Sequence, residues 1–173
     1  DDSISYGTNY LAPKQKADEI PEELIETLEW ENVNLSKESQ GSEPYETDSI
    51  QYYIHRRILQ KYDFLIDDDG SGEVADLVAI NNSEHEIDIT LYHLKYAIKG
   101  KHSKSIENLY QVCGQAQKSI RWKYQRGNKI FEHILKRSEN KEKNGRSSSI
   151  LKGTLEDILK LREEASNKKE LRF

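Results

Sequence analysis

Alternating apolar and polar positions indicate two strands near the middle of the chain. The run from Val74 to Ile80 is apolar and rich in β-branched residues, which is typical of a buried strand. A second run covers residues 87–96, and because side chains alternate along a strand, every second residue shares one face. That face comprises Ile87, Ile89, Leu91, His93 and Lys95. Turn-forming residues at 81–83 separate the runs, so the pattern predicts a hairpin, with a shorter strand before it over residues 62–66.

Apolar residues at helical spacing predict helices on both sides of this hairpin. Helices are expected over residues 21–30 and 48–60, the second with Asp48 as its N-cap and Gln51 completing a capping box. A third helix follows Ser105, and its apolar stripe is expected to be buried, with Cys113 as an inert core thiol. The stripe comprises Leu109, Val112, Cys113, Ala116 and Ile120. Residues 130–135 predict further helical packing, and Thr154 with Asp157 opens a last helix.

Composition divides the chain into three parts. Residues 34–47 and 138–149 are rich in Ser, Gly, Glu, Asn and Lys, which predicts a linker and a mobile loop. The expected organisation is therefore an acidic N-terminal arm and linker (1–47), a core (48–137), and a mobile loop with a C-terminal helix (138–173).

Charge is strongly segregated along the 173 residues, although the net charge is only −5. Residues 1–98 carry 22 acidic against 7 basic side chains, and residues 99–137 carry 2 against 10. An acidic cluster beside a basic segment suits metal-dependent chemistry on phosphates, and a solvated face of a charge-rich protein is the equally weighted alternative. No apolar run approaches the roughly 18 residues of a membrane span, and a lone cysteine excludes an internal disulfide, so a cytoplasmic protein is expected.

Four acidic residues lie between the first two expected strands, and a fifth, Asp76, lies near the start of the second. Asp67, Asp68 and Asp69 with two nearby glycines are typical of a turn, and their spacing does not fit the calcium loop of an EF-hand. Glu73 and Asp76 are less expected, because carboxylates are disfavoured inside strands. Their side chains would leave opposite faces unless a bulge intervened. Asp76 is the primary candidate metal ligand, Glu73 a second candidate, and both are expected to pair with Lys95.

Asp76 on one strand, with His93-Leu94-Lys95 on the next, resembles the PD-(D/E)XK phosphodiesterase superfamily. In that superfamily an Asp ends the first strand and Glu-x-Lys lies on the second. His93 stands at the acidic position, as Gln does in the Mrr-like restriction nucleases. The resemblance covers roughly residues 48 to 125 and extends to helicase-associated nuclease domains of bacterial defence systems. It implies an α/β fold with a restriction-endonuclease-like core, a central mixed β-sheet flanked by helices, and N- and C-terminal helical extensions.

The resemblance also implies roles for individual residues. Asp76, the Leu94 carbonyl and Glu73 would hold Mg²⁺, with Mn²⁺ as a substitute. Lys95 would position the attacking water or stabilise developing charge, and His93 would orient that water or take its proton. Gln115, on the polar stripe of the third helix, is a further catalytic candidate, with an ordinary solvent-facing role as the alternative. The expected nucleic-acid contacts are Lys99, Lys101, Lys104, Lys118, Arg121 and Lys123.

Three functions follow as hypotheses. The first is a metal-dependent endonuclease that hydrolyses nucleic acid, with DNA the expected substrate, in bacterial defence. The second keeps the fold without catalysis, as a DNA-binding or adaptor domain that partners a helicase. The third is an interaction domain in which Asp76 and Lys95 form a structural ion pair. DNA is the expected partner, and a helicase subunit or adjoining domain and a second copy of the chain are further candidates.

Overall fold

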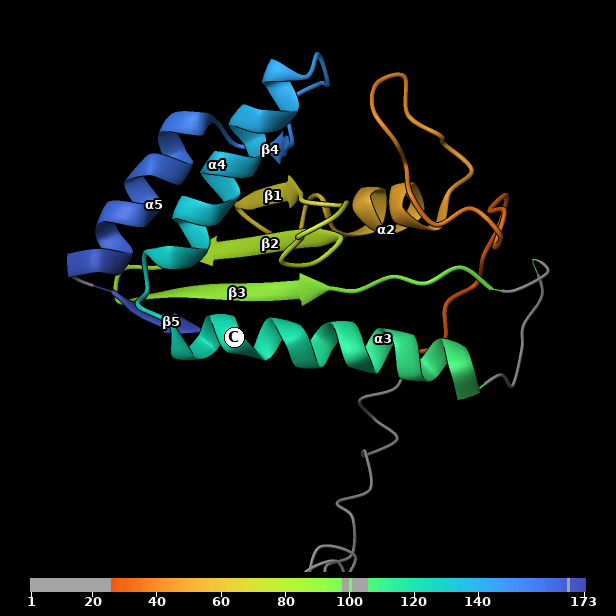
Figure 1. Ribbon diagram of the computed structural model, residues 1–173, viewed down its shortest axis with the longest axis horizontal. Helices are drawn as coiled ribbons and strands as arrows, with labels where there is room; N and C mark the ends of the chain where they lie inside the picture. Colours follow the sequence, from red (N-terminus) through yellow and green to blue (C-terminus); the bar gives the residue numbers. More distant parts are fainter. Residues whose placement is uncertain (1–25, 98–99, 101–105, 168) are drawn as a thin grey trace, which may run out of the picture. The chain divides into compact units, whose positions relative to one another are not determined.

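The computed structural model describes residues 26–97, 100, 106–167 and 169–173. The chain divides into two compact units, Asp1–Glu31 and Asn32–Phe173. In the first unit the described residues 26–31 form no helix, so the helix expected over residues 21–30 is wrong for that part of its range. Residues 21–25 lie outside the described part. The second unit holds all the helices and strands that the structure describes (Figure 1).

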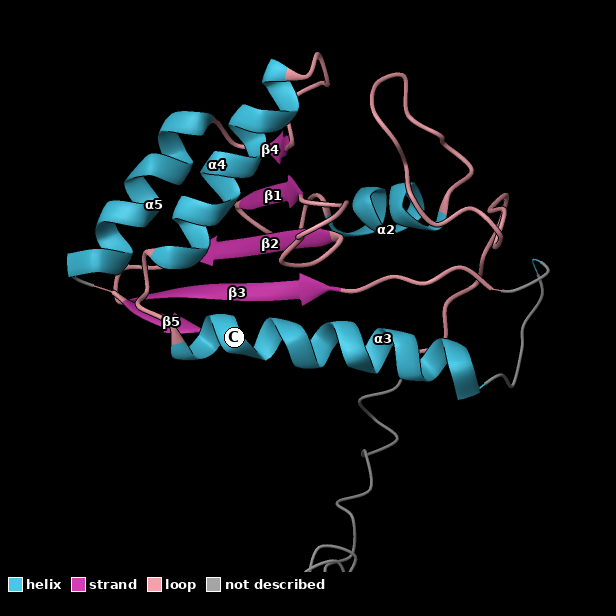
Figure 2. Ribbon diagram, in the orientation of Figure 1, coloured by secondary structure: helices cyan, strands magenta, loops and turns pink. Residues whose placement is uncertain are grey.

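A mixed five-stranded sheet forms the centre of this unit, in the order β4-β1-β2-β3-β5 (Figure 2). The strands are β1 (Phe64–Asp67), β2 (Leu77–Asn82), β3 (Glu86–Tyr92), β4 (Ile150–Lys152) and β5 (Glu170–Arg172). Strands β1, β2 and β3 pair antiparallel, as the expected hairpin requires, and β4 adds antiparallel to β1. Strand β5 adds parallel to β3. The expected α/β class with a central mixed sheet is confirmed.

Helices flank the sheet and complete the core. They are α2 (Ile50–Ile58), α3 (Ile106–Ser119), the 3₁₀ helix η3 (Ile120–Tyr124), α4 (Lys129–Lys143) and α5 (Leu155–Asn167). Helices α4 and α5 lie side by side over the sheet (Figure 1). Fully buried side chains of the sheet pack against Phe131 and Ile134 of α4 and Ile158 of α5. The helical packing expected near residues 130–135 is therefore confirmed. None of the helices in the described ranges is long and apolar enough to cross a membrane.

Helix α2 begins differently from the expectation. Its N-cap is Ser49, whose hydroxyl accepts a hydrogen bond from the Tyr52 N–H at 3.1 Å. Asp48 instead accepts from the Lys37 ammonium at 3.0 Å. Gln51, expected to complete the cap, is only 1 % exposed and turns into the protein. Either Asp48 or Ser49 suits an N-cap by chemistry, and the packing of Gln51 fixes which of them takes the position.

Helix α3 does not bury its apolar stripe as expected, and most residues on both its apolar and its polar side are exposed. Its apolar stripe lies at the surface, with Leu109 63 % and Ile120 54 % exposed, and Cys113 is exposed too. The polar side is anchored instead: the Ser119 hydroxyl donates to the Val74 carbonyl at 2.5 Å, and the Asn108 amide donates to the Tyr96 carbonyl at 3.3 Å. The expectation that the stripe and Cys113 are buried is wrong, because these polar contacts determine how the helix is rotated.

The C-terminal part belongs to the sheet. Helix α4 continues through the first half of the expected mobile loop, and the segment after it supplies both outer strands, β4 and β5. Helix α5 begins as expected, since the Thr154 hydroxyl accepts from the Asp157 N–H at 3.2 Å and the Asp157 carboxylate accepts from the Thr154 N–H at 2.8 Å. Residues 138–173 are thus an integral part of the compact unit that begins at Asn32, and the expected boundaries at 47/48 and 137/138 do not divide it.

Residues 34–47, which we call the strap, have no regular secondary structure and form hydrogen bonds with α2 and with the end of β1. Gln40 is completely buried and donates to the Asp67 carboxylate at 2.7 Å, while its amide oxygen lies 3.0 Å from His55 Nδ1. The Gln40 N–H donates to the Gln51 side chain at 2.8 Å. A linker would not bury a glutamine with all its polar groups satisfied, so the expectation of a linker here is wrong.

Candidate metal centre

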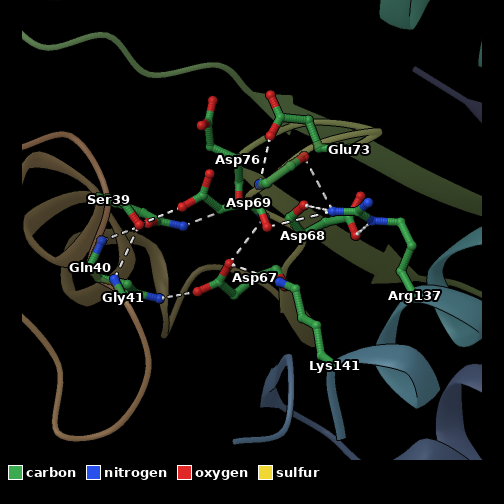
Figure 3. Close-up of polar contacts among 12 residues, drawn as sticks. Ser39, Gln40, Gly41, Asp67, Asp68, Asp69, Glu73, Asp76, Arg137 and Lys141 are labelled. Carbon is green, nitrogen blue, oxygen red and sulfur yellow. Dashed lines mark hydrogen bonds and ion pairs between the residues drawn. The ribbon is translucent and has the colours of Figure 1, made fainter. Parts of the chain in front are cut away.

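The loop between β1 and β2, Asp68–Asp76, gathers three carboxylates, and we call it the acidic loop. Ligand atoms of Asp69, Glu73 and Asp76, the carboxylate cluster, all lie within 4.8 Å of one another (Figure 3). Strand β2 begins at Leu77 and not at Val74 as expected, so Glu73 and Asp76 are free of the alternation that would have separated them. Gly70 and Gly72 have φ of +117° and +82°, which lets the loop fold back tightly.

Helix α4 holds the acidic loop in place through Arg137 (Figure 3). The guanidinium pairs with the nearly fully buried Asp68 carboxylate and donates to the Ser71 and Asp68 carbonyls at 2.6 and 2.7 Å. Asp68 also accepts from the Val74 N–H at 2.7 Å. Both carboxylate oxygens of Asp68 are thus engaged, so Asp68 holds the loop in place and is not one of the three carboxylates of the cluster.

Burial gives Asp76 unusual acid-base behaviour. Its side chain is 6 % exposed, and burial, helped by the negative charges of Glu73, Asp69 and Glu38, raises its pKa to about 7. The Leu94 N–H, which donates to Asp76 at 2.8 Å, opposes that rise. Burial also raises the pKa of Glu73. Among the described residues no Lys or Arg side chain forms an ion pair with the cluster, although the Arg137 charge partly opposes the rise in the Glu73 pKa. An oxygen-rich set of this kind suits a hard divalent cation such as Mg²⁺ or Mn²⁺.

His93 borders the carboxylate cluster without a hydrogen-bond partner. Its side chain is 7 % exposed, its Nδ1 lies 4.0 Å from Asp76 Oδ2, and neither ring nitrogen is hydrogen-bonded within the described residues. Burial lowers the pKa of His93, so the imidazole is neutral at neutral pH. A buried imidazole without a hydrogen bond lowers the stability of the folded protein. This indicates that an additional group beside His93 would supply the missing hydrogen bond.

Lys95 does not pair with Asp76 as expected. Strand β3 ends at Tyr92, so Lys95 leaves the strand and its ammonium lies 2.9 Å from the Glu38 carboxylate. The strap places Glu38 here, because the Gln51 N–H donates to the Glu38 carbonyl at 3.0 Å and the Tyr96 N–H donates to its carboxylate at 2.8 Å. The ion pair between Asp76 and Lys95 that a purely structural role required is therefore absent from the described contacts.

A pocket of about 360 Å³ opens beside the cluster, lined by Glu73, His93 and Gln115 among others. The Gln115 amide donates to the Glu73 carboxylate at 3.4 Å, and its amide oxygen is buried without a partner. Lys118 and Arg121 also line this pocket and are exposed. Glu73, His93 and Gln115, which were expected in the site and come from different parts of the chain, thus border one pocket. The expected nucleic-acid contacts Lys118 and Arg121 line the same pocket.

The remaining expected site residues fall elsewhere. Lys123 lines a separate pocket beside β3, and Lys99, Lys101 and Lys104 lie outside the described residues. Trp122, which lies between Arg121 and Lys123 in the chain, is 6 % exposed and belongs to the core, with the Arg121 guanidinium 5.0 Å from its ring. Leu94 contacts Asp76 through its amide N–H, and a role for its carbonyl stays a prediction.

Sequence reasoning missed three participants. Asp69 was assigned to a turn, although it joins the cluster and accepts a hydrogen bond from the Ser39 hydroxyl. Glu38 and Arg137 carried no local signal, because their partners lie 57 and 69 residues away in the chain. Only the run of three aspartates followed by two glycines could have suggested that Asp69 belongs to a site.

Comparison of the chain with family models, with curated proteins and with solved structures finds no match. The functional interpretation therefore depends on the geometry of this site.

Proposed function

We propose that the protein is a metal-dependent phosphodiesterase that cleaves nucleic acid, with DNA as its substrate. The observation that carries the proposal is the convergence of Asp69, Glu73 and Asp76 beside the unpartnered imidazole of His93. Three converging carboxylates favour binding of Mg²⁺ or Mn²⁺, and the exposed Lys118 and Arg121 at the neighbouring pocket suit a phosphate backbone.

Each residue has a distinct part in this proposal. Asp69, Glu73 and Asp76 would hold the divalent ion, which when bound supplies Lewis-acid activation of water and of the scissile phosphate. The neutral imidazole of His93 can accept a proton from the attacking water. Lys95, oriented by Glu38, would stabilise negative charge that develops on the phosphate. Gln115 would keep Glu73 directed toward the cluster.

Supercoiled plasmid provides the direct test. In Mg²⁺ or Mn²⁺ the wild-type protein should convert it to nicked or linear DNA, and EDTA should stop the reaction. Asp76→Asn and Lys95→Ala should each reduce the rate at least a hundredfold, because they remove a metal ligand and a charge that acts in the transition state. Asp88→Asn, on the same hairpin but away from the acidic loop, is the matched control. Undiminished nicking by both site variants would refute the assignment.

A second candidate function is nucleic-acid binding without cleavage, as an adaptor. The observation that favours it is His93 at the position where the resemblance calls for an acid. This candidate requires equal DNA affinity in Mg²⁺ and in EDTA and no cleavage in either. A helicase partner, a second copy of the chain and a role in bacterial defence stay predictions from the resemblance.

A further inference from the structure

A second pocket, of about 320 Å³, borders the carboxylate cluster at Asp69. The strap forms one wall, and the segment Arg146–Ser149, which follows α4, forms another. Sequence reasoning assigned this segment to a mobile loop and gave it no role. In the structure it is anchored on both sides, since the Arg146 N–H donates to the Lys141 carbonyl at 3.0 Å and the Asp67 N–H donates to the Ser149 carbonyl at 2.7 Å.

This wall presents hydrogen-bond donors that have no acceptor among the described residues. Ser147 accepts from the Glu43 N–H at 3.3 Å and Ser148 accepts from the Ile150 N–H at 3.2 Å, so each hydroxyl proton remains available. The Ser149 hydroxyl, in a residue 4 % exposed, has no partner at all. Arg146 is exposed, and its guanidinium forms no ion pair within the described part of the chain. Three hydroxyls and a guanidinium are thus left without acceptors.

The acidic groups of the same pocket are already engaged. One Asp67 oxygen accepts from the Gln40 amide at 2.7 Å, and the other accepts from the Asp69 N–H at 3.1 Å and lies 3.6 Å from the Lys141 ammonium. Asp69 accepts from the Ser39 hydroxyl (Figure 3). Burial raises the pKa of Tyr45, which also lines the pocket, so its phenol keeps its proton at neutral pH. The pocket is thus lined by two carboxylates and two cations, Lys141 and Arg146, and most of its hydrogen-bonding groups that remain without a partner are donors.

We propose that this pocket binds a phosphate group of the nucleic-acid strand, beside the phosphate that is cleaved. The inference rests on the proposed function, because Asp69 belongs to both the pocket and the carboxylate cluster. A phosphate offers only acceptor oxygens and negative charge, which complements Arg146 and the three serine hydroxyls. Such a contact fixes the register of the strand and carries no sequence preference.

Binding without metal tests the subsite apart from cleavage. A fluorescently labelled oligonucleotide is titrated with protein in EDTA at several salt concentrations, and affinity is read from anisotropy. Arg146→Ala should weaken binding about five- to tenfold and lower the slope of log affinity against log salt by about one. Lys143→Ala is the control for net charge, because it also removes one positive charge. Lys143 lies at the end of α4, where it is exposed and pairs with Glu139. Equal effects of the two substitutions would overturn the proposal.

Ser149→Ala separates binding from folding. The Ser149 hydroxyl has no hydrogen-bond partner among the described residues, so its removal should leave the melting temperature of the protein unchanged or higher. The same substitution should weaken binding of the oligonucleotide severalfold. At constant ionic strength, inorganic phosphate should displace the oligonucleotide from the wild-type protein more effectively than from Arg146→Ala. Identical displacement from both proteins would contradict a phosphate site.

The two proposals fail in different ways. If the plasmid is never cut but Arg146→Ala alone weakens binding in EDTA, the phosphate subsite stands and the phosphodiesterase does not. If the plasmid is cut and Arg146→Ala binds the oligonucleotide as Lys143→Ala does, cleavage stands and the subsite falls.

Discussion

At the scale of single residues, Asp76 affects both the stability of the folded protein and the proposed metal-dependent chemistry. Its carboxylate is buried beside Glu73 and Asp69 and receives one backbone N–H, from Leu94. The pKa of about 7 means that the folded protein keeps a proton on Asp76 under conditions where the unfolded chain, with an ordinary value near 3.8, has lost it. The folded state is therefore weakened as pH rises from about 4 to about 7.

This gives a prediction for stability in EDTA. Asp76→Asn keeps an acceptor for the Leu94 N–H and removes the buried charge, so at pH 8 it should raise the free energy of unfolding by on the order of 2 kcal/mol. At pH 4 the variant and the wild type should be nearly equal, because Asp76 is protonated in the folded protein there. Urea titrations at both pH values measure the difference. A variant less stable than the wild type at pH 8 would contradict the burial cost assigned to Asp76.

Cys113 gives a second prediction at this scale. The thiol is exposed on α3, although the apolar pattern around it predicted a core position. Ellman's reagent should modify one thiol per chain in the folded protein, at a rate within about tenfold of that in denaturant, because an exposed thiol is freely reached. Protection of the thiol until the protein unfolds would show that the helix has the rotation expected from its sequence.

At the scale of elements, α3 and α4 show that amphipathic character does not decide which face is buried. Both helices have a distinct apolar side. Helix α4 buries it, with Phe131 and Ile134 in the core, whereas α3 leaves Leu109 and Ile120 exposed. The difference arises from the Ser119 and Asn108 hydrogen bonds, which anchor the polar side of α3. A rotation that left these groups buried without partners would cost about 1–3 kcal/mol for each group.

The contrast is measurable by matched truncations on the two helices. Leu109→Ala should change the free energy of unfolding by less than about 0.5 kcal/mol, because the side chain is mostly in solvent. Ile134→Ala, which opens a cavity in the core, should cost about 2–5 kcal/mol. Chemical denaturation of both variants gives the comparison, and a large loss for Leu109→Ala would contradict the exposed position of the α3 stripe.

At the scale of the whole molecule, distant parts of the chain meet at the acidic loop. The strap supplies Glu38 and Gln40, the loop between β1 and β2 supplies the carboxylates, the segment after β3 supplies His93, and α4 supplies Arg137 and Lys141. The C-terminal segment completes the sheet through β4 and β5 and contributes Ile158 and Leu161 to the core. The site therefore depends on a unit that begins at Asn32 and extends to the last residue.

This organisation predicts the result of truncation. A chain ending at Ser149 loses β4, α5 and β5, which removes the outer partners of β1 and β3 and exposes the core under α5. We expect it to lack a cooperative urea transition by circular dichroism, because that loss exceeds the marginal stability of a domain of this size. Cooperative unfolding similar to that of the whole chain would support the alternative in which residues 138–173 are an appendage.

The sequence by itself determined the central hairpin, the packing face of α4 and the cap of α5. These depend on local periodicity, turn chemistry and one pair of residues three positions apart. It also placed Asp76 and His93 on adjacent strands of one hairpin, whereas the alternation along a strand left open whether Glu73 lies on the same side as Asp76.

The tertiary structure alone decided the partner of Lys95 and the membership of Asp69 in the carboxylate cluster. It also decided the rotation of α3 and the hydrogen-bond donors that Arg146–Ser149 present to the second pocket. Each depends on groups that are far apart in sequence, such as Glu38 with Lys95 or Asp68 with Arg137. Hydrogen bonds and ion pairs between such groups leave no periodic trace in the chain, because any polar residue that reaches the right place can form them.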